Sequence, residues 1–105
     1  MLRVYCEVLA VIVLLRGVLE SIERRDSDLA RQMRRAAASV ALNISEGSGS
    51  RGKNRGARYS NALGSMRETR ACLDVAVALG YIAVVDAEVA RQIDGICGSL
   101  YRLSH

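Results

Sequence analysis

Apolar residues recur along most of the chain at spacings of three and four, the period of helices that bury one face. This pattern predicts four helices, at about 2–24, 27–46, 54–79 (or 57–79) and 86–103. Their apolar seams consist of Val4, Val8, Val11, Leu15, Val18 and Ile22; Leu29, Met33, Ala36, Val40 and Ile44; Tyr59, Leu63, Met66, Leu73, Ala76 and Leu79; and Val85, Val89, Ile93, Ile96, Leu100 and Leu103. Because short connections join them, we expect an all-α, antiparallel up-down four-helix bundle that forms a single domain, residues 1–105.

Polar residues and glycines mark the expected helix ends. Asp26 or Ser27 can cap the second helix and Asp86 the last one, since short oxygen-bearing side chains accept hydrogen bonds from the first turn. Gly47 and Gly80 follow the second and third helices, and a glycine in the left-handed conformation is a common end for a helix. Gly17 lies inside the first helix and is expected to mark a close approach of a neighbouring helix.

The segment 34–47 begins with two arginines and then has no charged side chain from Ala36 to Ser45. A helix with one wet face should present polar residues every third or fourth position. We therefore expect this segment to be surrounded by protein on most sides, with its alanines allowing close contact. In a chain of 105 residues this indicates contact with other copies.

Composition supports a helical protein and limits its class. The chain has no Pro, Phe or Trp, and it is rich in residues that favour helices. The apolar run Val8–Leu15 is far shorter than the about 20 residues that span a bilayer, so we interpret it as a core helix. The three cysteines Cys6, Cys72 and Cys97 are an odd number and lie in largely apolar stretches, which favours buried free thiols and a cytoplasmic location.

The charge distribution provides the main functional signal. The net charge is +4, but the stretch from Arg24 to Arg70 holds eleven basic and only four acidic residues. Arginine suits phosphate because its planar guanidinium can make two hydrogen bonds at once. Few aromatic residues accompany these cations, which argues against recognition of individual bases. We expect one basic patch to bind nucleic acid, formed by Arg31, Arg34, Arg35, Arg51, Lys53, Arg55 and Arg58.

Other chemistry finds little support. Gly47, Gly49 and Gly52 match a dinucleotide-binding pattern, but they follow a helix and not a strand, so we do not expect a nucleotide fold. Glu46 and Glu68 are expected to pair with Arg35, Arg67 or backbone donors and so to fix the register of the bundle. The only histidine is His105, which removes the usual base for a nucleophile. We predict no catalytic residue, no metal, no cofactor and no enzymatic activity.

Three motifs resemble a known family. They are the segment Arg34–Gly47, the stretch Tyr59–Glu68 and the tripeptide Leu79-Gly80-Tyr81. Their order is similar to that of the four helix bundle protein family, also called the 23S ribosomal RNA intervening-sequence protein family. The positions that match its pattern as structural residues are Ser39, Asn43, Glu46, Gly47, Gly64, Ser65, Glu68 and Gly80.

The resemblance implies a bundle that assembles into a homopentameric ring, with no enzymatic activity. It also suggests binding to nucleic acid or to a nucleic-acid enzyme. A distant branch is the accessory variability protein of diversity-generating retroelements, which partners a reverse transcriptase.

Two hypotheses remain open. The first is an oligomeric module that binds RNA or DNA non-specifically through the basic patch, as accessory to a reverse transcriptase or an RNA-processing partner. The second is a structural or protein-interaction scaffold with no nucleic-acid role. A basic face that only keeps the protein soluble would be compatible with the second.

Overall fold

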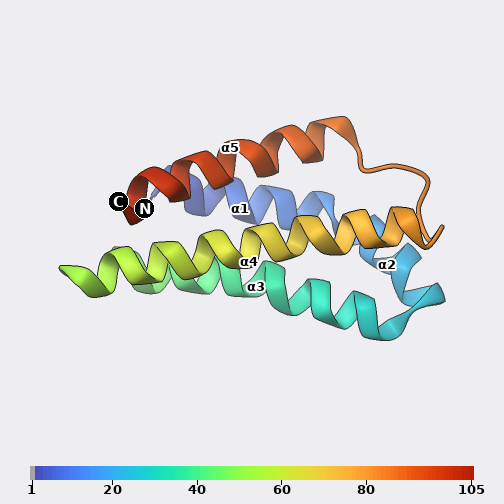
Figure 1. Cartoon of the computed structure of the whole chain (residues 1–105), viewed down its shortest axis with the longest axis horizontal. Helices are drawn as coiled ribbons and strands as arrows, with labels where there is room; N and C mark the ends of the chain where they lie inside the picture. The colour runs from blue at the N-terminus through green and yellow to red at the C-terminus, as the bar shows by residue number, and fades with distance from the viewer. Residues whose placement is uncertain (1) are drawn as a thin grey trace.

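A computed structural model describes residues 2–105, which form five α-helices (Figure 1). They are α1 (Arg3–Leu14), α2 (Arg16–Arg25), α3 (Ser27–Ser48), α4 (Lys53–Ala78) and α5 (Ala87–Ser104). No strand occurs among residues 2–105, which confirms the all-α class. The body is elongated, with extents of 43 × 24 × 20 Å.

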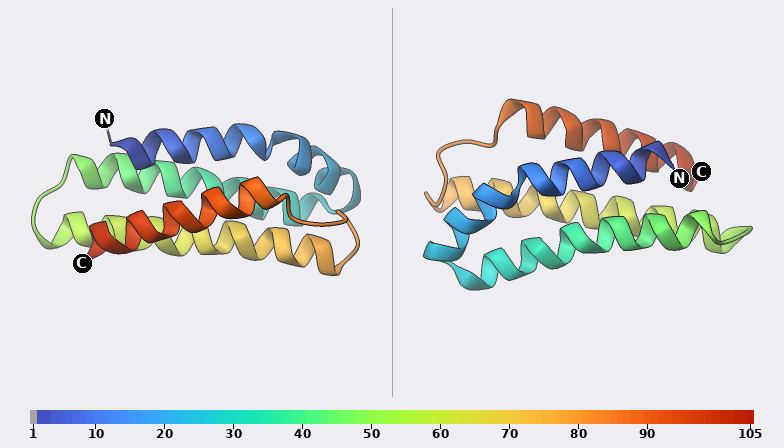
Figure 2. Two further views of the ribbon diagram at one scale, coloured as in Figure 1. Left: turned by 90° about the horizontal axis from the view of Figure 1, so that it is seen from above. Right: turned by 180° about the vertical axis from the view of Figure 1, so that it is seen from behind.

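The helices α1, α3, α4 and α5 lie roughly along the long axis of the body, and α3 and α4 run antiparallel beside each other (Figure 2). α5 packs along α4, α1 packs between α5 and α3, and α2 packs on α3. The seams converge on one apolar core whose largest fully buried side chains include Leu15, Ile22, Met33, Ile44, Tyr59, Met66, Leu73, Ile93, Ile96 and Leu100. No helix within residues 2–105 is both long enough and apolar enough to cross a membrane.

The expected first helix is two helices, so the count is five and not four. The helix is interrupted at Leu15, whose N–H is shared between the carbonyls of Val11 at 2.9 Å and Ile12 at 3.2 Å. Beyond this tightened turn α2 leaves the direction of α1 (Figure 1). The core seam moves with it, since Leu19 is buried where Val18 was expected.

The role expected for Gly17 is wrong. A Cβ added there would meet nothing within 4 Å, so no neighbouring helix approaches this position closely. The glycine stands two residues after the break at Leu15. It therefore weakens the helix at the bend instead of making room for a contact.

Three of the expected helix ends are confirmed. The Asp26 side chain accepts a hydrogen bond from the Leu29 N–H at 3.0 Å, and that of Asp86 accepts from the N–H groups of Glu88 and Val89 at 3.1 Å. Gly80 has a φ of +78° at the end of α4. The following N–H of Tyr81 bonds to the Ala76 carbonyl at 2.8 Å, which completes the glycine-terminated end.

The end expected at Gly47 is wrong. α3 continues to Ser48, and Gly47 is a buried helical residue without a positive φ. The chain turns only after that, and the left-handed glycine of this connection is Gly52, with φ +63°. The connection between α3 and α4 is therefore a short turn, because α4 already begins at Lys53.

The segment 36–45 is enclosed on one side only. Ala36, Ala37, Val40, Ala41 and Ile44 are buried in the core. The outward side includes Ala38 and Leu42, and Leu42 is 63% exposed. Enclosure on most sides is thus not achieved within one chain.

Candidate nucleic-acid interface

Four cations lie at the connection between α3 and α4. Arg51 is in the turn itself, and the first turns of α4 carry the other three, Lys53, Arg55 and Arg58. On the α3 side of this connection, the Ser50 hydroxyl donates a hydrogen bond to the Glu46 carbonyl at 2.7 Å, which ties the turn to the end of α3. We call Arg51, Lys53, Arg55 and Arg58 the basic turn. All four side chains are exposed.

The basic turn keeps most of its positive charge unpaired. Arg58 forms an ion pair with Glu46 at 3.0 Å, and the Arg55 guanidinium lies over the Tyr59 ring, 5.7 Å from its centroid. Arg51 and Lys53 have no ion-pair or hydrogen-bond partner within residues 2–105. Four cations and one carboxylate leave a strongly positive local field, which attracts polyanions.

The end of α5 lies beside the basic turn (Figure 2). A shallow pocket of about 510 Å³ is lined on one side by Gly52, Lys53, Arg55, Gly56 and Ala57, and on the other by Leu103, Ser104 and His105. The two helices approach closely here, because a Cβ added to Gly56 would stand 3.4 Å from the Ser104 carbonyl oxygen. No acidic side chain lines this pocket.

The arginines of α3 form a separate group. A helix rises about 1.5 Å per residue, so Arg35 lies about 18 Å along the axis from Gly47, near the turn. Arg31 pairs with Asp28 at 3.1 Å and Arg34 pairs with Glu23. The expected merging of Arg31, Arg34 and Arg35 with the basic turn into one patch is therefore wrong, since α3 separates the two groups along its length.

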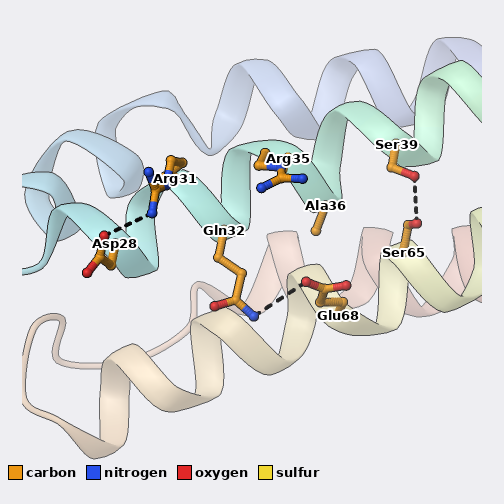
Figure 3. A pocket seen from close by; sticks show the side chains of 8 residues that line it. All are labelled: Asp28, Arg31, Gln32, Arg35, Ala36, Ser39, Ser65 and Glu68. Carbon is orange, nitrogen blue, oxygen red and sulfur yellow. Dashed lines mark hydrogen bonds and ion pairs between the residues drawn. The ribbon is translucent and has the colours of Figure 1, made fainter.

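Two of these arginines, Arg31 and Arg35, line a groove between α3 and α4 (Figure 3). It measures about 480 Å³ and is lined by Asp28, Arg31, Gln32, Arg35, Ala36, Ser39, Ser65 and Glu68. Two arginines and two carboxylates make its charged lining electrically balanced. A balanced groove offers a phosphate chain much less attraction than the basic turn does.

The serines of this groove belong to a polar contact between α3 and α4. The Ser65 hydroxyl donates to the Ser39 Oγ at 2.9 Å, as Figure 3 shows, and the Asn43 amide donates to the same oxygen at 3.0 Å. The Asn43 amide also bonds the Ser39 carbonyl at 2.9 Å. Sequence reasoning missed one further member, the fully buried Thr69, whose hydroxyl donates to the Ser65 carbonyl at 2.9 Å.

The partners expected for the two glutamates are wrong. Glu46 pairs with Arg58, and Glu68 accepts a long hydrogen bond of 3.5 Å from Gln32. Both glutamates are exposed, so neither forms a buried ion pair. The contact between Glu46 and Arg58 still links the end of α3 to the start of α4.

The three glycines of the family pattern occupy different environments. Gly47 lies against the Tyr59 ring, whereas Gly64 is exposed and a Cβ there would meet nothing within 4 Å. Gly80 ends α4, as described above. Of these three glycines, only Gly47 has a neighbouring side chain that would clash with a Cβ within one chain.

The thiols and carboxylates do not assemble a reactive centre in residues 2–105. No group of three or more metal-binding side chains is present in that range. Cys72 is buried, as expected, whereas Cys97 is only half-buried and Cys6 is exposed. Burial raises the pKa of the Cys72 thiol, and the Glu68 carboxylate raises it further. Burial also raises the pKa of the Cys97 thiol. Both sulfurs are therefore protonated near neutral pH, the less nucleophilic form.

Comparison with known proteins now identifies the family. Residues 4–102 match the family model described as 23S rRNA-intervening sequence protein. The chain matches no curated protein and no solved structure. The family match extends over nearly the whole length, including all of α2, α3, α4 and the basic turn and most of α1 and α5. The chain therefore belongs to the 23S rRNA-intervening sequence protein family.

Proposed function

We propose that this protein binds nucleic acid non-specifically through the basic turn, without acting as an enzyme. The observation that supports the proposal is the cluster of Arg51, Lys53, Arg55 and Arg58, in which only Arg58 is paired with a carboxylate. Phosphate contacts from such cations supply most of non-specific affinity. The name of the family refers to ribosomal RNA, which is consistent with a nucleic-acid partner.

The start of α4 adds a second source of attraction. Gly52 precedes the helix and provides no side chain to cap it. The Arg55 N–H bonds the Gly52 carbonyl at 3.2 Å, which leaves the N–H groups of Lys53 and Asn54 to an oxyanion, and the helix dipole favours negative charge at this end. Lys53 and Arg55 stand in that first turn.

Assembly would strengthen a weak individual site. We propose that α1 and α2 serve together as one arm of a four-helix bundle, and that copies of the bundle form a homopentameric ring. The exposed Leu42 and Ala38 on the outer side of α3 support a contact between chains. A ring would present several basic turns to one polyanion and multiply affinity through avidity. Delivery of the bound strand to a reverse transcriptase or an RNA-processing enzyme is the role we propose for the complex.

The experiment compares two variants with equal charge. In the first, Arg51, Lys53, Arg55 and Arg58 are all changed to Ser; in the second, Arg24, Arg31, Arg34 and Arg35 are all changed to Ser. Fluorescence anisotropy with mixed-sequence RNA and DNA should show binding lost in the first and largely kept in the second. Equal loss in both would show that net charge matters and not the basic turn.

A scaffold without a nucleic-acid role is the second candidate. The observation that favours it is the exposure of Leu42, a large apolar side chain on α3, at 63%. It predicts a stable assembly and no retention of RNA or DNA at moderate salt. The same anisotropy measurement separates the candidates.

A further inference from the structure

The last turn of α5 carries an exposed pair of aromatic rings. Tyr101 is 53% exposed, and its ring centroid lies 4.2 Å from that of His105 with the planes tilted by 31°. His105 Nδ1 lies 2.9 Å from the Tyr101 carbonyl oxygen. A carbonyl can only accept, so Nδ1 donates the proton and the imidazole is held against the phenol.

The histidine of this ring pair adjoins the basic turn. His105 lines the same pocket as Lys53 and Arg55. The close approach of Gly56 to Ser104 fixes the end of α5 at that position. A strand whose phosphates contact Lys53 and Arg55 would thus pass beside an aromatic face.

No other tyrosine of the chain offers such a face. Tyr59 is the aromatic residue nearest to the basic turn in sequence, but it is fully buried beneath Arg55. Tyr5 is half-buried, and Tyr81 is half-buried with its hydroxyl bonded to Asp26. Among the tyrosines only Tyr101 is classed as exposed.

We propose that this end of the molecule binds single-stranded nucleic acid, with an unpaired base stacked on the Tyr101–His105 pair and adjacent phosphates on Lys53 and Arg55. The inference rests on the proposed function and names the class of nucleic acid. Bases in a duplex are already stacked on their neighbours, so only an unpaired base has a free face for an aromatic ring. Every base has such a face, which makes the selection independent of sequence.

The test uses the full-length protein and four labelled probes of equal length. They are an oligothymidylate, an oligouridylate, an abasic deoxyribose strand and a duplex. Tyr101→Ala should weaken binding of the base-bearing single strands by about 5- to 150-fold, the effect of removing one base–aromatic stack. Binding of the abasic strand should not change. Comparing thymidylate with uridylate shows whether DNA, RNA or both are bound.

Two further variants control the test. Tyr101→Phe keeps the ring and should keep the affinity of the parent protein. Val84→Ala removes an exposed apolar side chain that is 71% exposed in the connection at the other end of α4, and it should leave all affinities unchanged. Circular dichroism of Tyr101→Ala should match that of the parent, because the exposed side chain does not belong to the core.

The outcomes separate this inference from the proposed function. If the abasic strand binds as tightly as the base-bearing strands and Tyr101→Ala changes neither, the stacking inference is wrong and binding through the basic turn stands. If the duplex binds more tightly than the single strands, the inference is likewise overturned. If no probe binds, both the inference and the proposed function fail.

Discussion

The ring of Tyr59 lies directly against Gly47. A Cβ built on Gly47 would stand 2.9 Å from Cε1 of Tyr59, closer than real Cβ contacts, and Tyr59 is fully buried and so has little room to move. The absence of a side chain at this position lets the end of α3 pack on the first turns of α4. This contact positions the basic turn.

The contact predicts a cost for the smallest enlargement of Gly47. Gly47→Ala should destabilise the fold by about 1–3 kcal/mol, the usual effect of overpacking a filled core. Urea unfolding followed by circular dichroism measures the change. Gly64→Ala is the matched control, because Gly64 is also inside a helix but a Cβ there meets nothing. The control should be neutral or stabilise by up to about 1 kcal/mol. An equal loss in both variants would contradict the packing explanation.

A second prediction concerns pH and the contact of Tyr81 with Asp26. The Leu29 N–H and the Tyr81 hydroxyl both donate to the Asp26 carboxylate, and these bonds lower its pKa below 3.8. Because the pKa of Asp26 is lower in the folded state, its ionised carboxylate stabilises the fold above pH 3.8, the unfolded pKa. This stabilisation is lost as pH falls through the folded pKa. The stability of Asp26→Asn, measured by acid unfolding, should therefore depend less on pH in that range than the stability of the parent protein does. Asn still caps a helix, so the variant isolates the charge.

The same contact acts on Tyr81 at high pH. The hydrogen bond to Asp26 raises the pKa of the Tyr81 phenol above 10.0, so its contribution is present below pH 10.0 and lost as pH rises through the folded pKa. Titration of tyrosinate absorbance, with Tyr81→Phe subtracted to isolate this residue, should show the raised pKa in the parent. In Asp26→Asn it should fall back toward 10.0. An unchanged titration would show that the Asp26 contact is not the cause.

The serine contact between α3 and α4 makes a third prediction. Ser39 Oγ accepts from both Ser65 and Asn43, whereas Ser65 makes one side-chain bond to Ser39. Ser39→Ala should therefore cost more than Ser65→Ala, because it removes the acceptor of the Ser65 hydroxyl and one of the two acceptors of the Asn43 amide. A double-mutant cycle should give a coupling of about 0.5–1.5 kcal/mol. A coupling near zero would mean that the bond does not contribute in solution.

Assembly can be tested at the outer side of α3. Five chains of 11.4 kDa give a ring of about 57 kDa, which native mass spectrometry distinguishes from smaller species. Leu42→Glu should dissociate the ring, since it would place a charge in the proposed contact. Val84→Glu, at a residue that is even more exposed, should not. A parent protein found only as a monomer would refute the proposed assembly.

Rules that act over a few residues predicted much of the fold. Capping by Asp26 and Asp86 and the glycine end at Gly80 depend only on local geometry, and all three were predicted correctly. The same local rule failed at Gly47, because tertiary packing against Tyr59 and not backbone conformation requires that glycine. The break at Leu15 was not predicted, since the spacing of apolar residues continues across it and Gly17 suggested a close helix approach instead of a bend.

The candidate site was predicted in part. The basic turn is local in sequence and is therefore predictable from it, whereas the distance of the α3 arginines from the turn depends on the length of that helix. The aromatic pair Tyr101–His105 was missed because it is far from the turn in sequence. The antiparallel order of the helices was the signal that could have found it, since it brings the end of α5 beside the start of α4.

The salt dependence of binding tests the central claim most directly. Each phosphate contact to a single strand lowers the slope of log K against log salt concentration by about 0.7, so three or four contacts from the basic turn predict a slope of about −2 to −3. The variant with Arg51, Lys53, Arg55 and Arg58 changed to Ser should lose most of that slope along with its affinity. A parent slope near zero, or a variant with the slope of the parent, would contradict binding through the basic turn.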